Sequence, residues 1–282
     1  MNQQTDKDSL SGALQPNEAF PAQATADQIL LQDLSQSGIL TLTLNRPLQF
    51  NALSHDMLDA LLLALNNVPE QARVIVIAAN GKAFCAGHDL KEMRAHIDEQ
   101  WQKELFDKCS HFMQKLTQLR QPVIAKVQGV AAAAGCQLVA NCDLAIAADN
   151  CRFGVSGINL GLFCSTPSVA LSRNISRKRA FEMLVTGNFI EASRAVDWGL
   201  INTAVPAESL DEAVAHLCQQ ICEKSAVAVS TGKHLFYQQI EQPMESAYAL
   251  AASTMACNML AEDVSEGIDS FFEKRKPEWK DK

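Results

Sequence analysis

The chain has 282 residues, of which 48% are hydrophobic, and its formal net charge at pH 7 is −8. This length can bury a large core, either as one domain with an appendage or as two domains. The basic residues form no dense stripe, which argues against a nucleic-acid partner, and no apolar run is long enough to span a bilayer. The nine cysteines are scattered, which is typical of free thiols in a reducing compartment.

The N-terminal stretch, residues 1–27, is polar and carries four acidic residues against one lysine. It matches neither a signal peptide nor an arginine-rich transit peptide, so we expect a disordered tail and, by default, a cytoplasmic protein. Residues 29–34 and 38–44 predict a β-hairpin. A helix is predicted over 55–67, with Ser54 as its N-cap.

Two later stretches each predict a buried strand, a turn of small residues and the start of a helix. In the first, the apolar run 74–79 precedes AFCAGHDLKE at 83–92. In the second, the run 122–127 precedes Gly129, four alanines and Gly135. Helix starts carry unpaired N–H groups, so two such turns could direct two backbone donors at one carbonyl oxygen. The alternative is a pair of ordinary helix starts where elements pack tightly.

The remaining pattern divides the chain into three parts. A polar patch at 94–103 precedes a helix predicted over 104–119, and a strand is predicted over 143–147. Beyond Arg177 the pattern is almost wholly helical. Helices are predicted there over 179–186, 192–198, 208–224, 227–239, 244–260 and 262–274. We therefore expect a tail at 1–27, an α/β core at 28–176 and a helical region at 177–282.

The two turns together resemble those of the crotonase superfamily, which contains enoyl-CoA hydratases and isomerases. The family pattern AFxAGxDL, followed further along by VIAxVxGxAxGGGCxLxxxCD, is matched here with a few substitutions, and the resemblance runs from about Ile29 to Trp279. It implies a spiral of ββα units with a helical C-terminal trimerisation region. It also implies a homotrimer or dimer of trimers, active in fatty acid metabolism, that takes a coenzyme A thioester as substrate or ligand and needs no cofactor or metal.

The resemblance also assigns residues to the chemistry. The backbone N–H groups of His88 and Ala134 would form an oxyanion hole for the thioester carbonyl, and alanine keeps the donor that glycine usually supplies. Hydration needs two proton transfers, for which hydratases use two glutamates. Their positions hold Gln137, which cannot accept a proton, and Gly157, which has no side chain. Standard hydratase activity is therefore expected to be absent or very low.

Two neighbouring residues, Cys164 and Ser165, offer a different chemistry. With His88 they could supply a nucleophile and a base for acyl transfer. The alternative is that Cys164 is buried and inert, as cysteine often is.

Coenzyme A carries phosphates, so cationic side chains should surround the entrance to its site. The resemblance implies contacts from Ala86 and Lys91 near the first turn. It further implies that Phe271 and Lys274 reach the adenine and phosphate held by a neighbouring subunit. The alternative for the C-terminal basic cluster is a solvated helix end.

Two classes of function therefore stay open. One is an acyl-CoA lyase, isomerase or thioesterase that stabilises a thioester enolate, and the other is a non-catalytic protein that binds or senses acyl-CoA. The missing carboxylates favour the second class or a changed chemistry. A dinucleotide-binding protein is set aside because no G-x-G-x-x-G follows a strand. Cys218 and Cys222 lie one helical turn apart, but no further ligands complete a metal site.

Overall fold

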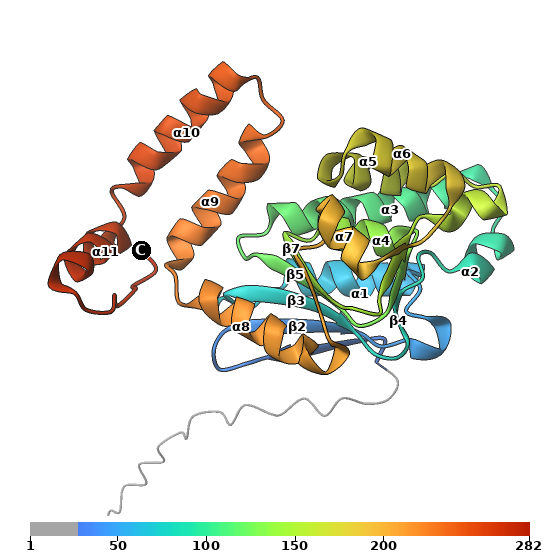
Figure 1. The fold of residues 1–282 in the computed structure, drawn as a ribbon, viewed down its shortest axis with the longest axis horizontal. Helices are drawn as coiled ribbons and strands as arrows, with labels where there is room; N and C mark the ends of the chain where they lie inside the picture. Colours follow the sequence, from blue (N-terminus) through green and yellow to red (C-terminus); the bar gives the residue numbers. More distant parts are fainter. Residues whose placement is uncertain (1–27) are drawn as a thin grey trace, which may run out of the picture.

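Two sheets form the centre of the protein in the computed structural model, which describes residues 28–282; the tail predicted at 1–27 lies outside the described residues. The larger sheet has six strands in the order β1-β2-β3-β5-β7-β10, and the smaller sheet has four in the order β4-β6-β8-β9. Neighbouring strands run parallel except in the pairs β1–β2 and β8–β9. Figure 1 shows helices covering the sheets and a separate group of helices at one end.

From β3 to β8 the strands alternate between the two sheets along the chain. Those of the larger sheet are β1 (Leu30–Leu34), β2 (Ile39–Leu44), β3 (Val74–Ala79), β5 (Val123–Val127), β7 (Leu144–Ala148) and β10 (Thr203–Val205). Those of the smaller sheet are β4 (Ala83–Cys85), β6 (Val130–Ala132), β8 (Arg152–Gly154) and β9 (Ile190–Glu191). Each long strand β3, β5 and β7 is followed by a short strand of the other sheet and then by a helix, which is the repeated ββα unit. The predicted hairpin is confirmed, with Leu30 opposite Leu44.

Apart from the start of α3, the predicted helices are confirmed. The helices are α1 (His55–Asn66), α2 (Leu90–Ala95), α3 (Glu99–Gln118), α4 (Ala134–Asn141), α5 (Ser165–Asn174), α6 (Arg177–Thr186), α7 (Ala192–Trp198), α8 (Leu210–Cys222), α9 (Ala226–Gln239), α10 (Met244–Asn258) and α11 (Glu262–Glu273). Ser54 caps α1 by accepting a hydrogen bond from the Met57 N–H, as predicted. The predicted start of α3 at residue 104 is wrong. The helix begins at Glu99 because Asp98 accepts a hydrogen bond from the Trp101 N–H, and its polar first turn carries no apolar pattern.

The region after Arg177 is less uniformly helical than its composition indicates. Strand β10 completes the larger sheet beside β7, and β9 completes the smaller sheet beside β8. The hydrophobic core also continues past residue 177 as far as Cys218 in α8. The sequence pattern misses β9 and β10 because strands of two and three residues are too short to show periodicity.

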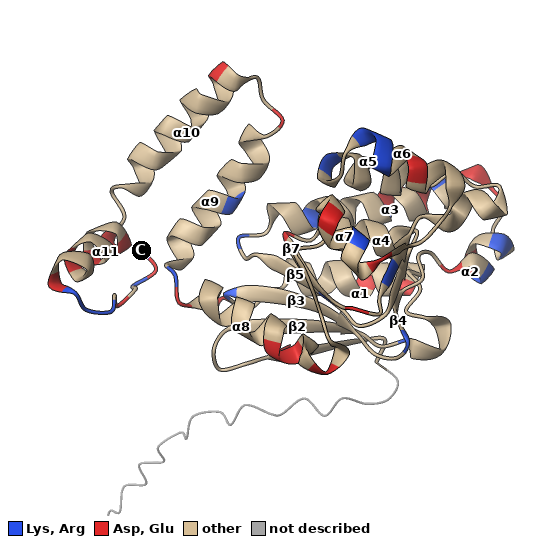
Figure 2. Cartoon of the chain, in the orientation of Figure 1, with Lys and Arg blue, Asp and Glu red and all other residues tan. Residues whose placement is uncertain are grey.

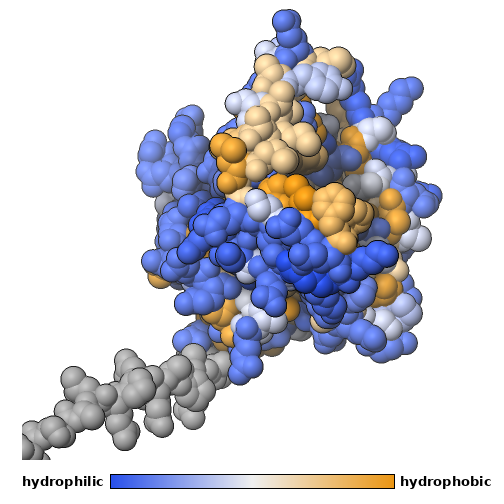
Figure 3. All heavy atoms as spheres, turned by 90° about the vertical axis from the view of Figure 1, so that its left-hand side faces the viewer, coloured by the Kyte–Doolittle hydropathy of each residue, from blue (hydrophilic) through white to orange (hydrophobic). Residues whose placement is uncertain are grey.

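Helices α9, α10 and α11 form what we name the C-terminal arm, which extends away from the sheets (Figure 1). Helix α10 carries a single charged residue, Glu245 in its first turn (Figure 2). None of its residues is buried, although a helix with so little charge would ordinarily be covered. Figure 3 shows a hydrophobic patch on this end of the molecule. The exposed apolar side chains of the arm include Phe236, Ile240, Met244, Tyr248, Met255, Met259 and Leu260.

The arm is anchored to the core by a buried polar cluster in α9. The Lys233 ammonium lies 2.6 Å from the Asp143 carboxylate and also donates to the carbonyl oxygens of Leu116 and Gln121, each at 2.8 Å. The Tyr237 hydroxyl donates to the same carboxylate at 2.7 Å. Burial of an ion pair is tolerated only when further hydrogen bonds satisfy both partners, and here they do.

Candidate oxyanion site

The two predicted turns lie in contact. Strands β4 and β6 pair in parallel, so the turns that follow them leave the same edge of the smaller sheet. Gly135 packs directly on main chain, since a Cβ there would stand 2.1 Å from the Cys85 carbonyl oxygen. Gly87 has a φ of +96°, and a Cβ there would stand 3.2 Å from the Ala134 nitrogen. Only glycine permits this approach at both positions.

The N–H of His88 points away from Leu53, the residue with which His88 forms an isolated parallel bridge. Leu53 donates its N–H to the Gly87 carbonyl at 2.8 Å and accepts from the Asp89 N–H at 3.4 Å. In such a parallel bridge the residues on either side of His88 face Leu53, so the His88 N–H points to the opposite side. Within residues 28–282 this N–H has no hydrogen-bond partner.

The N–H of Ala134 is the first of α4. The first N–H groups of a helix have no acceptor within the helix, and that of Ala134 has none elsewhere in the part of the chain that the structure describes. Its orientation is set by Ala133, whose φ of 48° and ψ of −118° are strained for a residue other than glycine. The Ala133 N–H holds this conformation by donating to the Gly154 carbonyl at 2.8 Å.

Both donors border one cavity of about 260 Å³. Its walls come from the two turns, from α2 and α3, from the segment between β8 and α5, and from the first turn of α5. The lining residues are Ala86, His88, Leu90, Met93, Phe106, Ala133, Ala134, Ser156, Gly157, Leu160, Leu162, Phe163, Cys164, Ser165, Thr166 and Pro167. None of these is acidic, and most are apolar, so the cavity suits an alkyl chain attached to a polar carbonyl.

The two titratable side chains of this lining, His88 and Cys164, are both uncharged at neutral pH. The His88 Nδ1 lies 3.3 Å from the Leu53 carbonyl oxygen, which can only accept, so Nδ1 carries the proton. Its Nε2 is buried and has no partner among the described residues. Burial lowers the pKa of the His88 imidazole and raises the pKa of the Cys164 thiol.

The two positions at which the resemblance predicts the hydratase glutamates, Gln137 and Gly157, differ in their surroundings. Gln137 is 4% exposed in α4, and its Oε1 has no partner among residues 28–282. A Cβ at Gly157 would stand 2.7 Å from the Leu162 carbonyl oxygen and 2.8 Å from Cys164 Sγ. The Cys164 thiol therefore occupies the space in which a side chain at 157 would begin. The Ser165 hydroxyl lies beside it and donates to the Phe163 carbonyl at 3.3 Å.

The two nearby acidic side chains bind backbone. Asp89 caps α2 by accepting from the N–H groups of Lys91 and Glu92, and it lies 3.6 Å from Arg46. Glu92 accepts from the His55 N–H at 3.1 Å. Both carboxylates hold the first turn in place from outside the cavity.

The residues predicted to contact coenzyme A are not all brought together within one chain. Ala86 lines the cavity, and Lys91 lies exposed in the first turn of α2. Phe271 is 79% exposed, and Lys274 follows directly after α11. Figure 1 shows α11 and α2 at opposite ends of the molecule, so any joint role needs a second subunit.

Metal and membrane features are not found in the described part of the chain. No group of three histidine, cysteine or acidic side chains within residues 28–282 could hold a metal ion. No helix in that part is long and apolar enough to cross a membrane.

A spiral of ββα units with two free backbone donors at a shared cavity defines the crotonase class of proteins. The chain belongs to the enoyl-CoA hydratase/isomerase family, whose model matches residues 35–282. The family resemblance and the fold predicted from it are thereby confirmed.

Individual relatives support the same assignment. The crystal structure of enoyl-CoA hydratase from Mycobacterium smegmatis is 55% identical, with a TM-score of 0.89, covering 90% of this chain and 99% of that one. The structure of human enoyl Coenzyme A hydratase domain-containing protein 3 is 40% identical, with a TM-score of 0.87, covering 89% of this chain and 100% of that one. Enoyl-CoA hydratase domain-containing protein 3, mitochondrial, of Rattus norvegicus is 41% identical over 271 residues, covering 95% of this chain and 90% of the relative.

The name of the rat relative also corrects one prediction. That protein is named mitochondrial, as are its mouse and human counterparts, so the cytoplasmic location predicted from residues 1–27 is wrong on this comparison. The prediction rested on the absence of a targeting pattern. Composition is a weak guide here, because targeting segments are read by receptors and removed, and fold physics places no constraint on them.

Proposed function

We propose that this protein binds acyl-CoA thioesters with the thioester carbonyl oxygen between the N–H groups of His88 and Ala134. The observation that carries the proposal is the pair of free backbone donors at one cavity. A carbonyl held by two such donors becomes an enolate more easily, and one donor is typically worth ~10²–10³ in rate. The apolar walls of the cavity would receive the alkyl chain.

We further propose that hydration by this site is slow. A water must lose a proton and the adjacent carbon must gain one, and each transfer by a positioned group is commonly worth ~10²–10⁴. Gln137 cannot accept a proton and Gly157 offers no group at all. The neutral Cys164 thiol is a poor nucleophile, which also disfavours a thioesterase that uses it.

A second candidate is a protein that binds or senses acyl-CoA without turning it over. The observation that favours it is a cavity lining in which no described residue is acidic and both titratable groups are neutral. Turnover of a thioester, measured beside its binding, separates the two candidates.

The proposed assembly is a homotrimer or a dimer of trimers. The exposed apolar face of the C-terminal arm supports it, because a 15-residue apolar helix with no buried residue is unstable in water unless another surface covers it. In this assembly Phe271 and Lys274 would contact the coenzyme A nucleotide of a neighbouring subunit, while Ala86 and Lys91 contact the ligand of their own.

Calorimetry with acetoacetyl-CoA and with short and medium acyl-CoAs tests the binding proposal, and free coenzyme A is the matched control because it lacks the thioester carbonyl. We expect the thioesters to bind more tightly than free coenzyme A. Folded protein that binds no thioester at millimolar concentration would refute the proposal. An absorbance assay with crotonyl-CoA then measures hydration on the same sample.

A further inference from the structure

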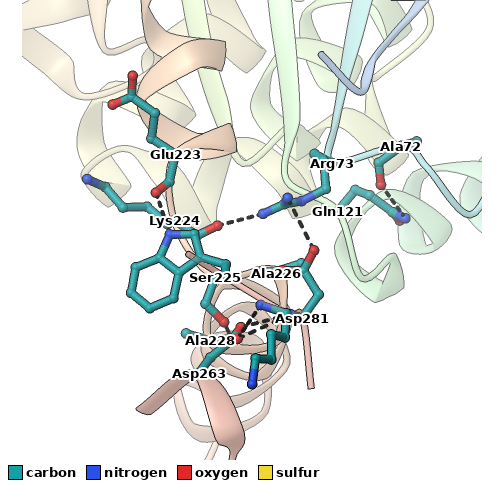
Figure 4. A network of polar contacts seen from close by, with 12 residues as sticks. Ala72, Arg73, Gln121, Glu223, Lys224, Ser225, Ala226, Ala228, Asp263 and Asp281 are labelled. Atoms are coloured by element: carbon teal, nitrogen blue, oxygen red, sulfur yellow. Dashed lines mark hydrogen bonds and ion pairs between the residues drawn. The ribbon is translucent and has the colours of Figure 1, made fainter. Parts of the chain in front are cut away.

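The chain beyond α11 folds back towards the core. Residues 275–282, which we name the C-terminal strap, cross the junction between α8 and α9 (Figure 4). The reversal occurs at Lys274, which has a left-handed conformation with φ 56°. The Arg275 guanidinium then binds the Glu266 carboxylate through both of its terminal nitrogens, at 2.5 and 2.9 Å. This bidentate pair fixes the direction in which the strap leaves α11.

The strap is attached to both α11 and α8. Asp263, which is 3% exposed at the start of α11, accepts hydrogen bonds from the N–H groups of Lys280 at 2.7 Å and Asp281 at 3.2 Å. The Trp279 indole N–H donates to the Glu223 carbonyl, directly after α8, at 2.7 Å. The same ring packs on α11, where it lies 3.3 Å from the position of a Cβ at Gly267.

Asp281 joins the strap to the base of the arm and to the core. Its Oδ1 accepts from the N–H of Ala226, the first residue of α9, at 2.9 Å. Its Oδ2 lies 3.4 Å from Nη1 of Arg73, which directly precedes β3. Arg73 also donates from Nη2 to the Lys224 carbonyl at 2.5 Å. The Asp281 carboxylate therefore contacts the residue that precedes β3 and the start of α9, while the Asp281 backbone N–H donates to Asp263 in α11 (Figure 4).

This arrangement closes a ring. The chain leaves the core at residues 223–225, passes through α9, α10 and α11, and is brought back by the strap to the same junction. Without the strap, the buried pair of Lys233 with Asp143 still holds α9, but within residues 28–282 α11 is then joined to the core through α9 and α10 alone. The position of α11 relative to the sheets then depends on the strap.

We propose that the strap, through Asp281, is a positioning device for coenzyme A binding: it holds α11 where Phe271 and Lys274 can reach the nucleotide bound by a neighbouring subunit. The inference rests on the proposed function, since it concerns the nucleotide part of the same ligand. Asp281 touches no ligand in this scheme and is a positioning residue.

The test compares two ligands and three variants of the strap, two of them at Asp281 and one at Glu278. Asp281→Ala removes the contacts with Arg73 and Ala226, whereas Glu278→Ala removes a carboxylate for which the structure records no side-chain bond in the described part of the chain. Calorimetry measures an acyl-CoA and the matching acyl-pantetheine, which has the same thioester but no nucleotide. Asp281→Asn is a milder variant, because an amide oxygen can still accept from Ala226 but carries no charge for Arg73.

We expect Asp281→Ala to weaken acyl-CoA binding about tenfold, the usual worth of one charge-assisted phosphate contact, while acyl-pantetheine affinity stays within about twofold of wild type. Asp281→Asn should show a smaller loss with the same ligand selectivity, and Glu278→Ala should match wild type with both ligands. An equal loss for both ligands, or unchanged acyl-CoA binding in both Asp281 variants, would overturn the proposal. A wild type that binds neither thioester would instead defeat the proposed function, and this inference with it.

Discussion

Replacement of Gly135 by alanine perturbs the contact that sets the distance between the two backbone donors. The added Cβ would stand 2.1 Å from the Cys85 carbonyl oxygen and 2.7 Å from its carbonyl carbon, whereas ordinary contact begins at 3.4 Å. The two turns must therefore separate by about 1.3 Å, the difference between those distances. Both opposing atoms are main chain, so no side-chain rotation can relieve the overlap.

This separation is large compared with the tolerance of the site. Donors to a single oxygen need N···O distances of about 2.7–3.1 Å, so a shift of this size removes one of them. Loss of one neutral hydrogen bond, worth about 0.5–1.5 kcal/mol, should weaken thioester binding about two- to tenfold. Any enolate-forming step should slow by ~10²–10³. Overpacking costs about 1–3 kcal/mol, which in a chain of this size lowers Tm by about 2–12 °C.

The assay combines calorimetry with acetoacetyl-CoA and thermal unfolding of the same samples. Gly232→Ala in α9 is the matched control, because a Cβ there meets nothing within 4 Å, and it should leave both quantities unchanged or raise Tm slightly. A Gly135→Ala protein that binds acetoacetyl-CoA with wild-type affinity and melts within about a degree of wild type would refute the reasoning. The spacing of the turns would then not depend on this contact.

Four further outcomes are expected. Wild-type hydration of crotonyl-CoA should lie at least ~10³-fold below that of a typical hydratase. Recovery of hydratase activity should need both Gln137→Glu and Gly157→Glu, and the second should lower stability because its Cβ would stand 2.7 Å from a backbone carbonyl oxygen. The absorbance assay on wild type, both single variants and the double variant checks this. Ordinary hydratase turnover by the wild type would contradict it. Burial lowers the pKa of His88 in the folded protein below its ordinary value of 6.5, so the unfolded chain binds a proton on this imidazole more tightly than the folded protein does. The stability that neutral His88 contributes to the folded state is therefore fully present above pH 6.5 and is lost as pH falls through the lower pKa of the folded state. Urea unfolding across this range should show a slope that His88→Gln reduces, and equal slopes would argue against it. Lys233→Met leaves the Asp143 charge, 14% exposed, without its partner and should lower the unfolding free energy by about 3–5 kcal/mol in urea; a loss below about 1 kcal/mol would show that the pair is not anchoring the arm. Light scattering should report a trimer or hexamer at micromolar concentration, and a monomer would exclude the proposed in-trans contacts.

The regular elements of this fold are encoded locally, which is why the sequence predicts most of them. Helix α1 shows its apolar face and its cap within a dozen residues. Strand β3 is a continuous apolar run, and β5 is apolar except for Lys126, because both faces of a parallel sheet are largely covered. The sequence pattern does not predict the short strands β6, β9 and β10, because two or three residues are too few to show a periodicity. They are strands only because a longer neighbour pairs with them.

The candidate site, like the fold, has some features that the sequence determines and others that only the tertiary structure decides. The sequence alone determines that no carboxylate stands at Gln137 or Gly157, and its family motifs point to the two turns as the donors. Only the tertiary structure decides that Gly135 lies against the Cys85 carbonyl and that the Cys164 thiol fills the space beside Gly157. The reason is physical: periodicity records which face of a segment is buried, whereas a close approach between main chains far apart in sequence depends on how whole layers pack. The position of the C-terminal arm is decided at the same level, by the strap and by Lys233, and no local pattern in the sequence records it.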